Sequence, residues 1–346
     1  MKNKRSLSAV VLTMVLVLAM CLSLAACGSS TTTDTSASAA TEAPAETAAD
    51  TTAEGKVYTV GVCQLVQHEA LDAATQGFQD ALIDALGEGN VVFDVQNAAG
   101  DSATCSTIVN SFVSKNVDLI MANATASLQA AYNATSEIPI LGTSITEYGV
   151  ALGIDDFNGT VGGNVSGTSD LAPLDEQADM VLELVPDAKN VGLLYCSAEP
   201  NSEYQVKVVE EALTAKGLTC TRFSFADSND VASVTTKAAS ASDVIYIPTD
   251  NTAASCIETI GNIVLDAKVP VIAGEAGLCR GAGIATLSIS YYDLGWKTGE
   301  MAAQILTGEA DISEMPIEYA DATKQCNAAN CEALGIEIPE GYEPLD

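Results

Sequence analysis

Basic residues are scarce in this 346-residue chain, which has 14 Lys and Arg against 46 Asp and Glu and a single histidine. A nucleic-acid partner requires clusters of Lys and Arg that neutralise phosphates, so a net charge of −32 excludes that class. One histidine also argues against a zinc site. We therefore expect no nucleic acid, metal or other cofactor, and interpret the acidity as a solvated surface.

Enzyme signatures are absent too. The sequence has no G-x-S-x-G nucleophile elbow, no Walker A loop and no zinc-ligand spacing. The Gly-rich passage 159–167 follows no strand as a dinucleotide loop would, which favours a turn between lobes. We expect no catalytic residue and interpret His68 as a hydrogen bonder at a helix entry or pocket rim. One rival hypothesis stays open, a secreted enzyme that uses His68 with an acid.

The first 26 residues have the pattern of a lipoprotein signal peptide. Three basic residues lie among the first five, an apolar run covers 9–24, and the run ends in Ala25-Ala26-Cys27. We expect Cys27 to be lipidated and to become the mature N-terminus. Residues 29–55 are mostly Ser, Thr, Ala and acid with hardly a large apolar residue, which predicts a disordered tether over 27–55. The expected location is extracytoplasmic, lipid-anchored to the bacterial cell membrane.

No C-x-x-C pair occurs among the ten cysteines. Eight follow Cys27, most of them inside apolar strand or helix patterns, where cysteine behaves as a small buried hydrophobe. Buried thiols and a disulfide framework both fit this pattern. Cys326 and Cys331 are the pair to test first.

From residue 56 the chain alternates strand and helix patterns. Strand patterns at 57–62, 91–95, 119–122 and 138–141 alternate with helical spacing at 71–86, 104–113 and 126–135. The scheme restarts after residue 167. Helical patterns then cover 173–185, 202–216, 230–241 and 253–265, with strand patterns at 190–195, 219–225, within 242–252 and at 269–273. The alternation predicts the α/β class with parallel sheets and right-handed crossovers.

Two strand ends match each other. Asp118 lies seven residues before Thr125, and Asp243 lies seven residues before Asp250. This repeat predicts two Rossmann-like, doubly wound lobes, covering 56–165 and 166–275. Part of 276–320 is expected to return to the first lobe and part of the C-terminal tail to the second. A chain that crosses several times forms a multi-crossing hinge.

Polar side chains follow the predicted strands, where parallel α/β sheets bind their ligands. They suit a small polar ligand, with Asp250 expected at its cationic group and Thr125 at its anionic end. About half of them are equally suited to capping helices. The strand-end residues are Gln64, Gln67, His68, Asn97, Asn123, Thr125, Ser127, Thr143, Ser144, Ser197, Glu199, Asn201, Ser202, Thr249, Asp250, Asn251 and Glu275.

Five blocks, in order, resemble the TrpX-like ABC transporter substrate-binding lipoproteins. The blocks are Gly61-Val62-x-Gln64-x3-His68, Gln96-Asn97-Ala98-x-Gly100-Asp101, Gly163-Asn164-Val165-x-Gly167-x-Ser169-Asp170, Pro248-Thr249-Asp250-Asn251-Thr252 and Tyr291-Tyr292-Asp293-Leu294-Gly295. The resemblance implies a type I periplasmic-binding-protein fold that closes on a ligand and presents it to a membrane permease. It places ten residues at the cleft: Gln64, Thr125, Thr143, Ser169, Asp170, Asn201, Ser202, Asp250, Asn251 and Glu275. Gly142 stands where this family often has an aromatic residue, which removes a stacking surface.

The favoured hypothesis is therefore a solute receptor of an ABC importer. Its folded part is expected to be monomeric and to capture an amino acid, aromatic ones included, or a similar small polar solute by hinge closure. Two alternatives stay open. The ligand could be a nucleoside or a sugar, or the lipoprotein could signal a bound ligand to a membrane receptor.

Overall fold

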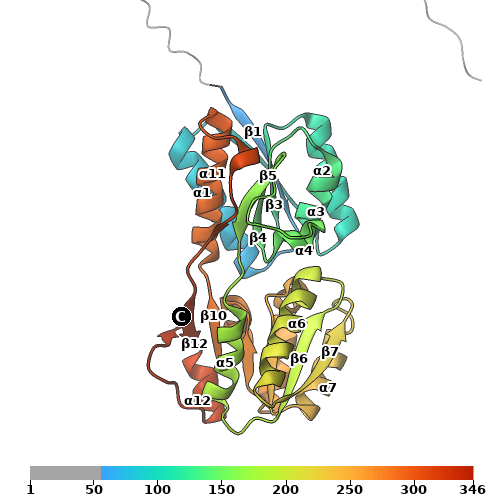
Figure 1. The fold of residues 1–346 in the computed structure, drawn as a ribbon, viewed down its shortest axis with the longest axis vertical. Coiled ribbons are helices and arrows are strands. Elements are labelled where there is room, and N and C mark those ends of the chain that lie inside the picture. The colour runs from blue at the N-terminus through green and yellow to red at the C-terminus, as the bar shows by residue number, and fades with distance from the viewer. Residues whose placement is uncertain (1–55, 346) are drawn as a thin grey trace, which may run out of the picture. The chain divides into compact units, whose positions relative to one another are not determined.

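The computed structural model describes residues 56–345; the expected signal peptide, Cys27 and the tether lie outside this range. The described residues form two α/β lobes, each built on its own sheet (Figure 1). This confirms the predicted fold class. All eight cysteines in the described range are free thiols, including Cys326 and Cys331, which are both buried.

The sheet of the first lobe has six strands, and all of its pairs are parallel. Its strands, in spatial order, are β11 (Glu318–Tyr319), β5 (Val165–Ser169), β4 (Ile140–Ile145), β3 (Leu119–Asn123), β1 (Tyr58–Gln64) and β2 (Val91–Asn97). The central strand β3 is buried throughout because helices cover both faces, and its sequence Leu-Ile-Met-Ala-Asn has no exposed polar alternation.

The sheet of the second lobe has seven strands. In spatial order they are β13 (Glu343–Pro344), β12 (Thr323–Cys326), β10 (Ala285–Ser288), β9 (Val271–Ala273), β8 (Val244–Ile247), β6 (Asn190–Cys196) and β7 (Thr219–Phe225). Only the β10–β12 pair is antiparallel among the pairs described. Strands β10-β9-β8-β6-β7 follow the same winding order as β5-β4-β3-β1-β2 in the first lobe, so the two lobes repeat one topology.

Helices cover both faces of each sheet (Figure 1). In the first lobe they are α1 (Glu69–Leu86), α2 (Ser102–Lys115), α3 (Thr125–Ala134), α4 (Tyr148–Leu152) and α11 (Tyr291–Thr307), with the 3-10 turn η1 (Ile312–Glu314). In the second they are α5 (Leu174–Leu184), α6 (Pro200–Ala215), α7 (Val231–Ala241), α8 (Asn251–Ser255), α9 (Ile257–Asp266), α10 (Ala276–Gly281) and α12 (Ala328–Leu334).

The helical pattern predicted at 253–265 is interrupted. Helix α8 ends at Ser255 and α9 begins at Ile257, with Cys256 between them outside helical dihedral angles. The two helices have different anchors. Asp250 caps α8, whereas α9 packs so closely on α10 that a Cβ at Gly261 would lie 2.2 Å from the carbonyl oxygen of Gly281. Because the two helices are fixed by different contacts, the predicted single helix is replaced by two helices.

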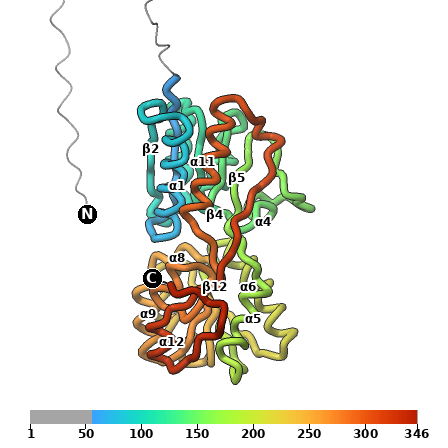
Figure 2. Tube along the Cα trace, turned by 90° about the vertical axis from the view of Figure 1, so that its left-hand side faces the viewer, coloured from blue at the N-terminus to red at the C-terminus, as the bar shows by residue number. Residues whose placement is uncertain are grey.

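The chain crosses between the lobes three times: from β5 to α5, from β10 to α11, and from β11 to β12. The tube in Figure 2 shows the red C-terminal chain passing from the first lobe back to the second. Helix α11 thus packs on α1 although more than 200 residues separate them in sequence. The three crossing segments together form a hinge, rather than a single linker.

Helices α1 and α11 approach each other closely because glycines face the contact. A Cβ at Gly295 would lie 2.0 Å from the Ala74 carbonyl oxygen, and a Cβ at Gly77 would lie 2.1 Å from the Tyr292 carbonyl oxygen. The packed pair covers one face of the first sheet and directs the N-terminal ends of both helices toward the second lobe (Figure 1).

Asp118 and Asp243, the first residues of the two matching pairs in the sequence repeat, occupy equivalent positions in their lobes. Asp118 accepts a hydrogen bond from the Thr59 amide at 2.8 Å, and Asp243 accepts one from the Asn190 amide at 2.8 Å. Each carboxylate therefore anchors the beginning of the neighbouring central strand, β1 or β6. The second member of each pair, Thr125 or Asp250, lies at the opposite end of its strand, toward the other lobe.

Candidate functional site

An enclosed cavity lies between the lobes, at the carboxyl ends of strands from both sheets. Its non-atom space is ≈ 280 Å³, of which only ≈ 10 Å³ admits the centre of a water molecule. A small-molecule site measures about 300 to 1,000 Å³, so the lining residues lie nearly in contact here and the lobes must separate to admit a solute. The lining residues are His68, Leu71, Ser144, Thr146, Asp170, Asn201, Thr249, Asp250, Asn251, Ala254, Glu275 and Tyr291.

The charge of the lining is one-sided. Three carboxyl groups line the cavity, from Asp170, Asp250 and Glu275, and none of the described lining residues is Lys or Arg. Each of the three side chains is at least 95% buried. Because burial without a cation disfavours the charged form, the pKa of each carboxyl is raised above its usual range.

Asp250 and Glu275 each cap a helix of the second lobe. Asp250 accepts from the Ala253 amide at 2.7 Å with one oxygen and from the Cys196 amide at 2.6 Å with the other. Glu275 accepts from the amides of Gly277 and Leu278, one on each oxygen. Burial raises the pKa of Glu275 to about 7, while burial and then the neighbouring Glu199 charge raise that of Asp250. Both oxygens of each carboxyl group therefore already accept hydrogen bonds within the second lobe.

Asp170 lies on the crossing from β5 to α5, and it differs from the other two carboxyls. One oxygen, Oδ2, accepts a hydrogen bond from the Tyr291 hydroxyl at 2.8 Å. The other oxygen, Oδ1, is buried without a hydrogen-bond partner. Burial raises the pKa of Asp170, and the hydroxyls of Tyr291 and Thr146 partly oppose this. Asp170 therefore keeps an unused acceptor at the cavity.

Ser144 lies at the end of β4 in a backbone conformation that serine rarely adopts, with φ = 57°. Such a left-handed residue costs about 1–3 kcal/mol and is common at ligand sites. The conformation coincides with an irregularity in the β4–β5 pairing between Gly142 and Ile145. The Ser144 hydroxyl is buried and has no hydrogen-bond partner.

Two polar contacts join the lobes beside the cavity. His68 Nε2 lies 3.2 Å from Asn251 Oδ1. The N-cap residue of α1 therefore contacts the first residue of α8. Glu69 forms an ion pair with Arg280 of α10, at a partly exposed position. Burial lowers the pKa of His68, and this outweighs the Asn251 contact and the nearby carboxylates.

Glu199 organises the second lobe's side of the cleft. Its carboxylate accepts from the amide and side chain of Asn251, at 3.1 and 2.7 Å, and from the amide and hydroxyl of Thr252, at 2.9 and 2.7 Å. It also accepts from the Asn201 amide group at 3.2 Å. Four of these five bonds fix the start of α8, which carries Asn251 into the cavity.

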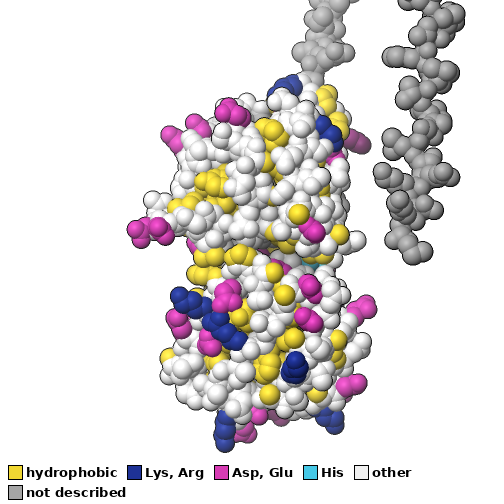
Figure 3. Space-filling view, turned by 90° about the vertical axis from the view of Figure 1, so that its right-hand side faces the viewer, with side chains coloured by type: hydrophobic (Ala, Val, Ile, Leu, Met, Phe, Trp, Pro, Cys, Tyr) yellow, Lys and Arg dark blue, Asp and Glu magenta, His cyan; other side chains and the backbone are white. Residues whose placement is uncertain are grey.

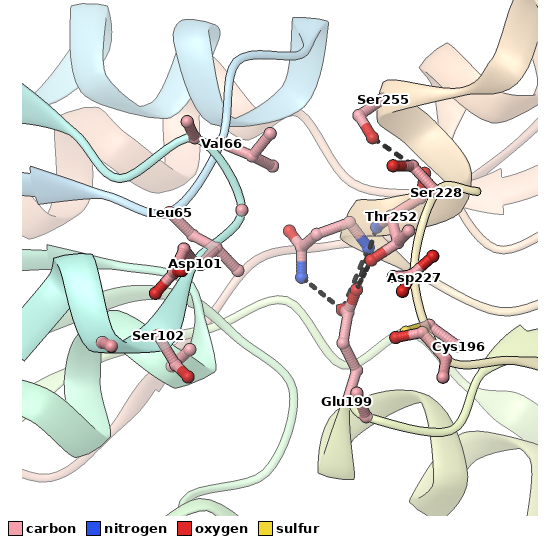
Figure 4. A pocket seen from close by; sticks show the side chains of 17 residues that line it. Leu65, Val66, Asp101, Ser102, Cys196, Glu199, Asp227, Ser228, Thr252 and Ser255 are labelled. Atoms are coloured by element: carbon pink, nitrogen blue, oxygen red, sulfur yellow. Dashed lines mark hydrogen bonds between the residues drawn. The ribbon is translucent and has the colours of Figure 1, made fainter. Parts of the chain in front are cut away.

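A wider cavity of ≈ 590 Å³, by the same measure of water-accessible space, opens next to the enclosed one. Figure 4 shows Leu65, Asp101 and Ser102 of the first lobe facing Glu199 and Thr252 of the second across it. Asn251 lines both cavities. The space-filling view shows a groove between the lobes and more acidic than basic side chains on this face (Figure 3).

Five of the ten residues that the resemblance implied for the cleft line the enclosed cavity. Asp170 comes from the crossing, Asn201 from the first turn of α6, Asp250 and Asn251 from the end of β8, and Glu275 from the end of β9. The structure brings these residues together although the first and last are 105 positions apart.

The other five lie outside the cavity lining: Gln64, Thr125, Thr143, Ser169 and Ser202. All five are buried within their own lobe. Thr125 is the first residue of α3, and Ser202 accepts from Asn201 at 3.3 Å. Ser169 donates to the Thr146 carbonyl oxygen at 3.0 Å, so it supports a residue that does line the cavity.

Gln64 and Thr143 make their side-chain contacts within the first lobe. Gln64 donates to Asp72 at 2.6 Å and accepts from Thr75 at 2.7 Å, which ties β1 to α1. The Thr143 hydroxyl lies 3.3 Å from that of Thr168 on the adjacent strand. Both side chains meet partners inside the first lobe.

Seven lining residues were not among those ten. His68, Ser144 and Thr249 stand in the strand-end set, so the sequence signal existed but was shared with many caps. Tyr291 stands in the last of the five blocks and starts α11, yet only the fold shows that this tail returns to the cavity. Leu71, Thr146 and Ala254 carry no distinguishing signal. Within the described range, no three His, Cys, Asp or Glu side chains come together as metal ligands.

Residues 59–342 match the family described as ABC transporter substrate binding protein. A relative named tyrosine-binding protein, from Clostridioides difficile (strain R20291), is 36% identical over 275 residues, which are 79% of this chain and 79% of that protein.

Two solved structures differ in how well they superpose. An ABC domain in complex with L-Trp, from Streptococcus pneumonia, is 31% identical with a TM-score of 0.80. The ligand-free, open structure of a substrate binding protein with adhesive properties, from Clostridium difficile, is 37% identical with a TM-score of only 0.64. In each case 84% of this chain and 99% of that chain are covered. The lobes here are therefore arranged more like those of the L-Trp complex, although its sequence is less similar.

None of the helices formed by residues 56–345 has the length and apolarity that a membrane crossing requires. The matching family consists of extracytoplasmic substrate-binding proteins, not of enzymes, and its match covers most of both lobes. The chain belongs to the ABC transporter substrate-binding protein family.

Proposed function

We propose that this protein captures an amino acid, with tyrosine and tryptophan as the first candidates, and delivers it to the permease of an ABC importer. The single observation that carries the proposal is the enclosed, polar cavity lined by both lobes. Its lining is rich in hydroxyl, amide and carboxyl groups, which suit a small polar solute. The names of the two relatives that bind tyrosine and L-Trp support the choice of candidates.

Capture works by closure of the lobes. A ligand that contacts Ser144 and Tyr291 on one lobe and Asn201 and Asn251 on the other favours the closed state, because it binds that state more tightly. The small space open to water implies that a ligand enters while the lobes are apart. The better superposition on the L-Trp complex than on the ligand-free structure supports a closed arrangement here.

Membrane attachment through Cys27 belongs to the same proposal. Acyl chains on the mature N-terminus would hold the protein at the membrane, and residues 28–55 would give the lobes reach toward the permease. Mass spectrometry of the protein from membranes should show diacylglycerol on Cys27. A Cys27→Ala variant should appear in the soluble fraction, and its retention in the membrane would contradict the anchor.

The ligand class is tested by thermal unfolding of the purified protein against L-amino acids, nucleosides and sugars. A ligand at 100 times its Kd stabilises the folded state by about 2.7 kcal/mol, which shifts the melting temperature measurably. We expect tyrosine, tryptophan or a related amino acid to give the largest shift. A shift given only by sugars or nucleosides would contradict the proposal.

A further inference from the structure

Five buried side-chain oxygen atoms in the described residues lack a hydrogen-bond partner, and two of these five line the enclosed cavity. They are Asp170 Oδ1 and Ser144 Oγ. Both side chains are at least 94% buried. A buried polar atom without a partner costs about 1–3 kcal/mol, so two of them in one cavity indicate groups that a ligand satisfies.

The other two carboxyls of the cavity are already used. Both oxygens of Asp250 and both oxygens of Glu275 accept backbone amide hydrogen bonds within the second lobe. Asp170 is held by one oxygen only, through the Tyr291 hydroxyl. Its remaining oxygen is the one carboxyl acceptor among the described lining residues that is left for a ligand.

We infer that Asp170 Oδ1 and Ser144 Oγ form the subsite for a protonated primary amine of the ligand. An ammonium group has three donors and no acceptor, which matches two acceptors that lack donors. Its charge also offsets the cost of burying the Asp170 carboxylate. Tyr291 acts as the positioning residue, since its hydroxyl fixes the orientation of the carboxyl group.

The ligand's amine then determines specificity more than its carboxylate does. No Lys or Arg among the described lining residues faces the cavity, so a ligand carboxylate finds only neutral donors there. A ligand without the amine leaves Asp170 buried and unpaired, which a site built for hydrogen bonding rejects strongly. This inference rests on the proposed function and specifies which end of the amino acid is recognised.

Calorimetric titration of the purified protein with matched ligands tests it. One set is L-tyrosine, tyramine and 4-hydroxyphenylpropanoate, and the other is L-tryptophan, tryptamine and indole-3-propanoate. We expect removal of the amine to weaken binding by about tenfold to 100-fold, as for loss of a hydrogen bond to a charged group. Removal of the carboxylate should weaken it less.

Two variants probe the subsite from the protein's side. Asp170→Asn should weaken binding of the amino acid by about tenfold to 100-fold, and Ser144→Ala by about threefold to tenfold. Asp175→Asn, on the exposed first turn of α5, is the matched control and should bind as the wild type does. Against the deaminated ligand, Asp170→Asn should lose nothing.

Stability without ligand supplies a second readout. Burial raises the pKa of Asp170 in the folded state above the value of about 4 that an aspartate has in the unfolded chain. The folded protein therefore loses stability as the pH rises from about 4 through that higher pKa. Asp170→Asn should therefore melt at the same or a higher temperature than the wild type at pH 7. A purely structural aspartate would instead lower the melting temperature on substitution. If Asp170→Asn fails to fold, the ligand pairs on wild type and Ser144→Ala decide.

Failure of the amine subsite can be distinguished from failure of the proposed function. If the amino acid binds but its deaminated partner binds equally and Asp170→Asn changes nothing, the amine subsite is wrong and the proposed function stands. If no amine-bearing member of either set binds the wild type while a sugar or nucleoside does, the subsite and the proposed function are both overturned.

Discussion

At the scale of single residues, a carboxylate at a strand end can serve either a helix or a ligand. Asp250 was expected at the ligand's cationic group, yet its two oxygens each accept a backbone amide at 2.6 and 2.7 Å. Asp170 keeps an unpartnered oxygen in the same cavity. We therefore rank Asp170 above Asp250 as the residue that contacts the ligand directly.

Substitution of Asp250 should consequently cost stability first. Asp250→Ala removes the cap of α8 and leaves the buried Cys196 amide without its acceptor. The loss of a cap and of a buried partner amounts to about 2 to 4 kcal/mol in the free energy of unfolding. Urea denaturation measures it. Asp311→Ala, which removes a cap from the exposed turn η1, is the control and should cost less.

Unchanged stability of Asp250→Ala together with lost ligand affinity would reverse the ranking of the two aspartates. It would show that the backbone contacts are incidental and that the side chain serves the ligand, as its place at the strand end first indicated.

At the scale of elements, helices α1 and α11 pack in close contact, and the pair brings the N-terminal ends of both helices to the cleft. Gly295→Ala places a Cβ 2.0 Å from the Ala74 carbonyl oxygen. Alanine favours a helix over glycine by only about 1 kcal/mol, whereas overpacking costs about 1–3 kcal/mol or more. We expect net destabilisation and weaker ligand binding, because Tyr291 and His68 start these helices.

Thermal unfolding and titration of Gly295→Ala check this expectation. Gln304→Ala, on the exposed side of the same helix, is the control for helix propensity alone and should unfold at or above the wild-type temperature. A stabilised Gly295→Ala variant would show that the helices can separate freely and that their contact does not set the cleft.

Most elements were predictable because their patterns are local. Strands such as β3 are uninterrupted apolar runs, and helices such as α1 repeat apolar residues at helical spacing. The break between α8 and α9 was not predictable, because it depends on Asp250 and on the contact of Gly261 with Gly281, both set by tertiary structure. Tyr291 was missed for the same reason, because it reaches the cavity only through the second crossing, which leads from β10 to α11.

The site was half visible in sequence for a comparable reason. Strand ends identify the right edge of each sheet, so Asn201, Asp250 and Asn251 could be expected near the cavity, whereas Asp170 was implied only by the family resemblance. Which way a strand-end side chain points is set by its partners. Gln64 turns into the first lobe because Asp72 and Thr75 bind it there, and no pattern in the sequence of β1 encodes that choice.

At the scale of the whole molecule, the lobes meet at a histidine. His68 is buried against Asn251 when the lobes are together, and this burial lowers its pKa. Carboxylates of Glu199, Asp72 and Glu69 face it and oppose the shift without reversing it. Since the closed state holds His68 neutral, protonation favours the open state. Closure is therefore fully supported above pH of about 6.5 and weakens as pH falls below it.

Ligand affinity should thus decrease between about pH 7 and pH 5, and small-angle scattering should show the ligand-bound protein becoming more open. Asp170 acts in the same direction, because its protonation removes the acceptor charge. His68→Gln separates the two effects, since it keeps a hydrogen bonder but cannot titrate. We expect the variant to retain part of the pH dependence. A pH profile identical to that of the wild type would exclude His68 as a contributor.

A crystal structure of the protein with L-tyrosine or L-tryptophan tests the central claim most directly, namely that the enclosed cavity between the lobes binds an amino acid. We predict one ligand per chain in this cavity, with its ammonium within hydrogen-bond distance of Asp170 Oδ1 and Ser144 Oγ. Ligand density confined to the wider cavity beside Asp101 and Glu199, or an enclosed cavity left empty at saturating ligand, would contradict it.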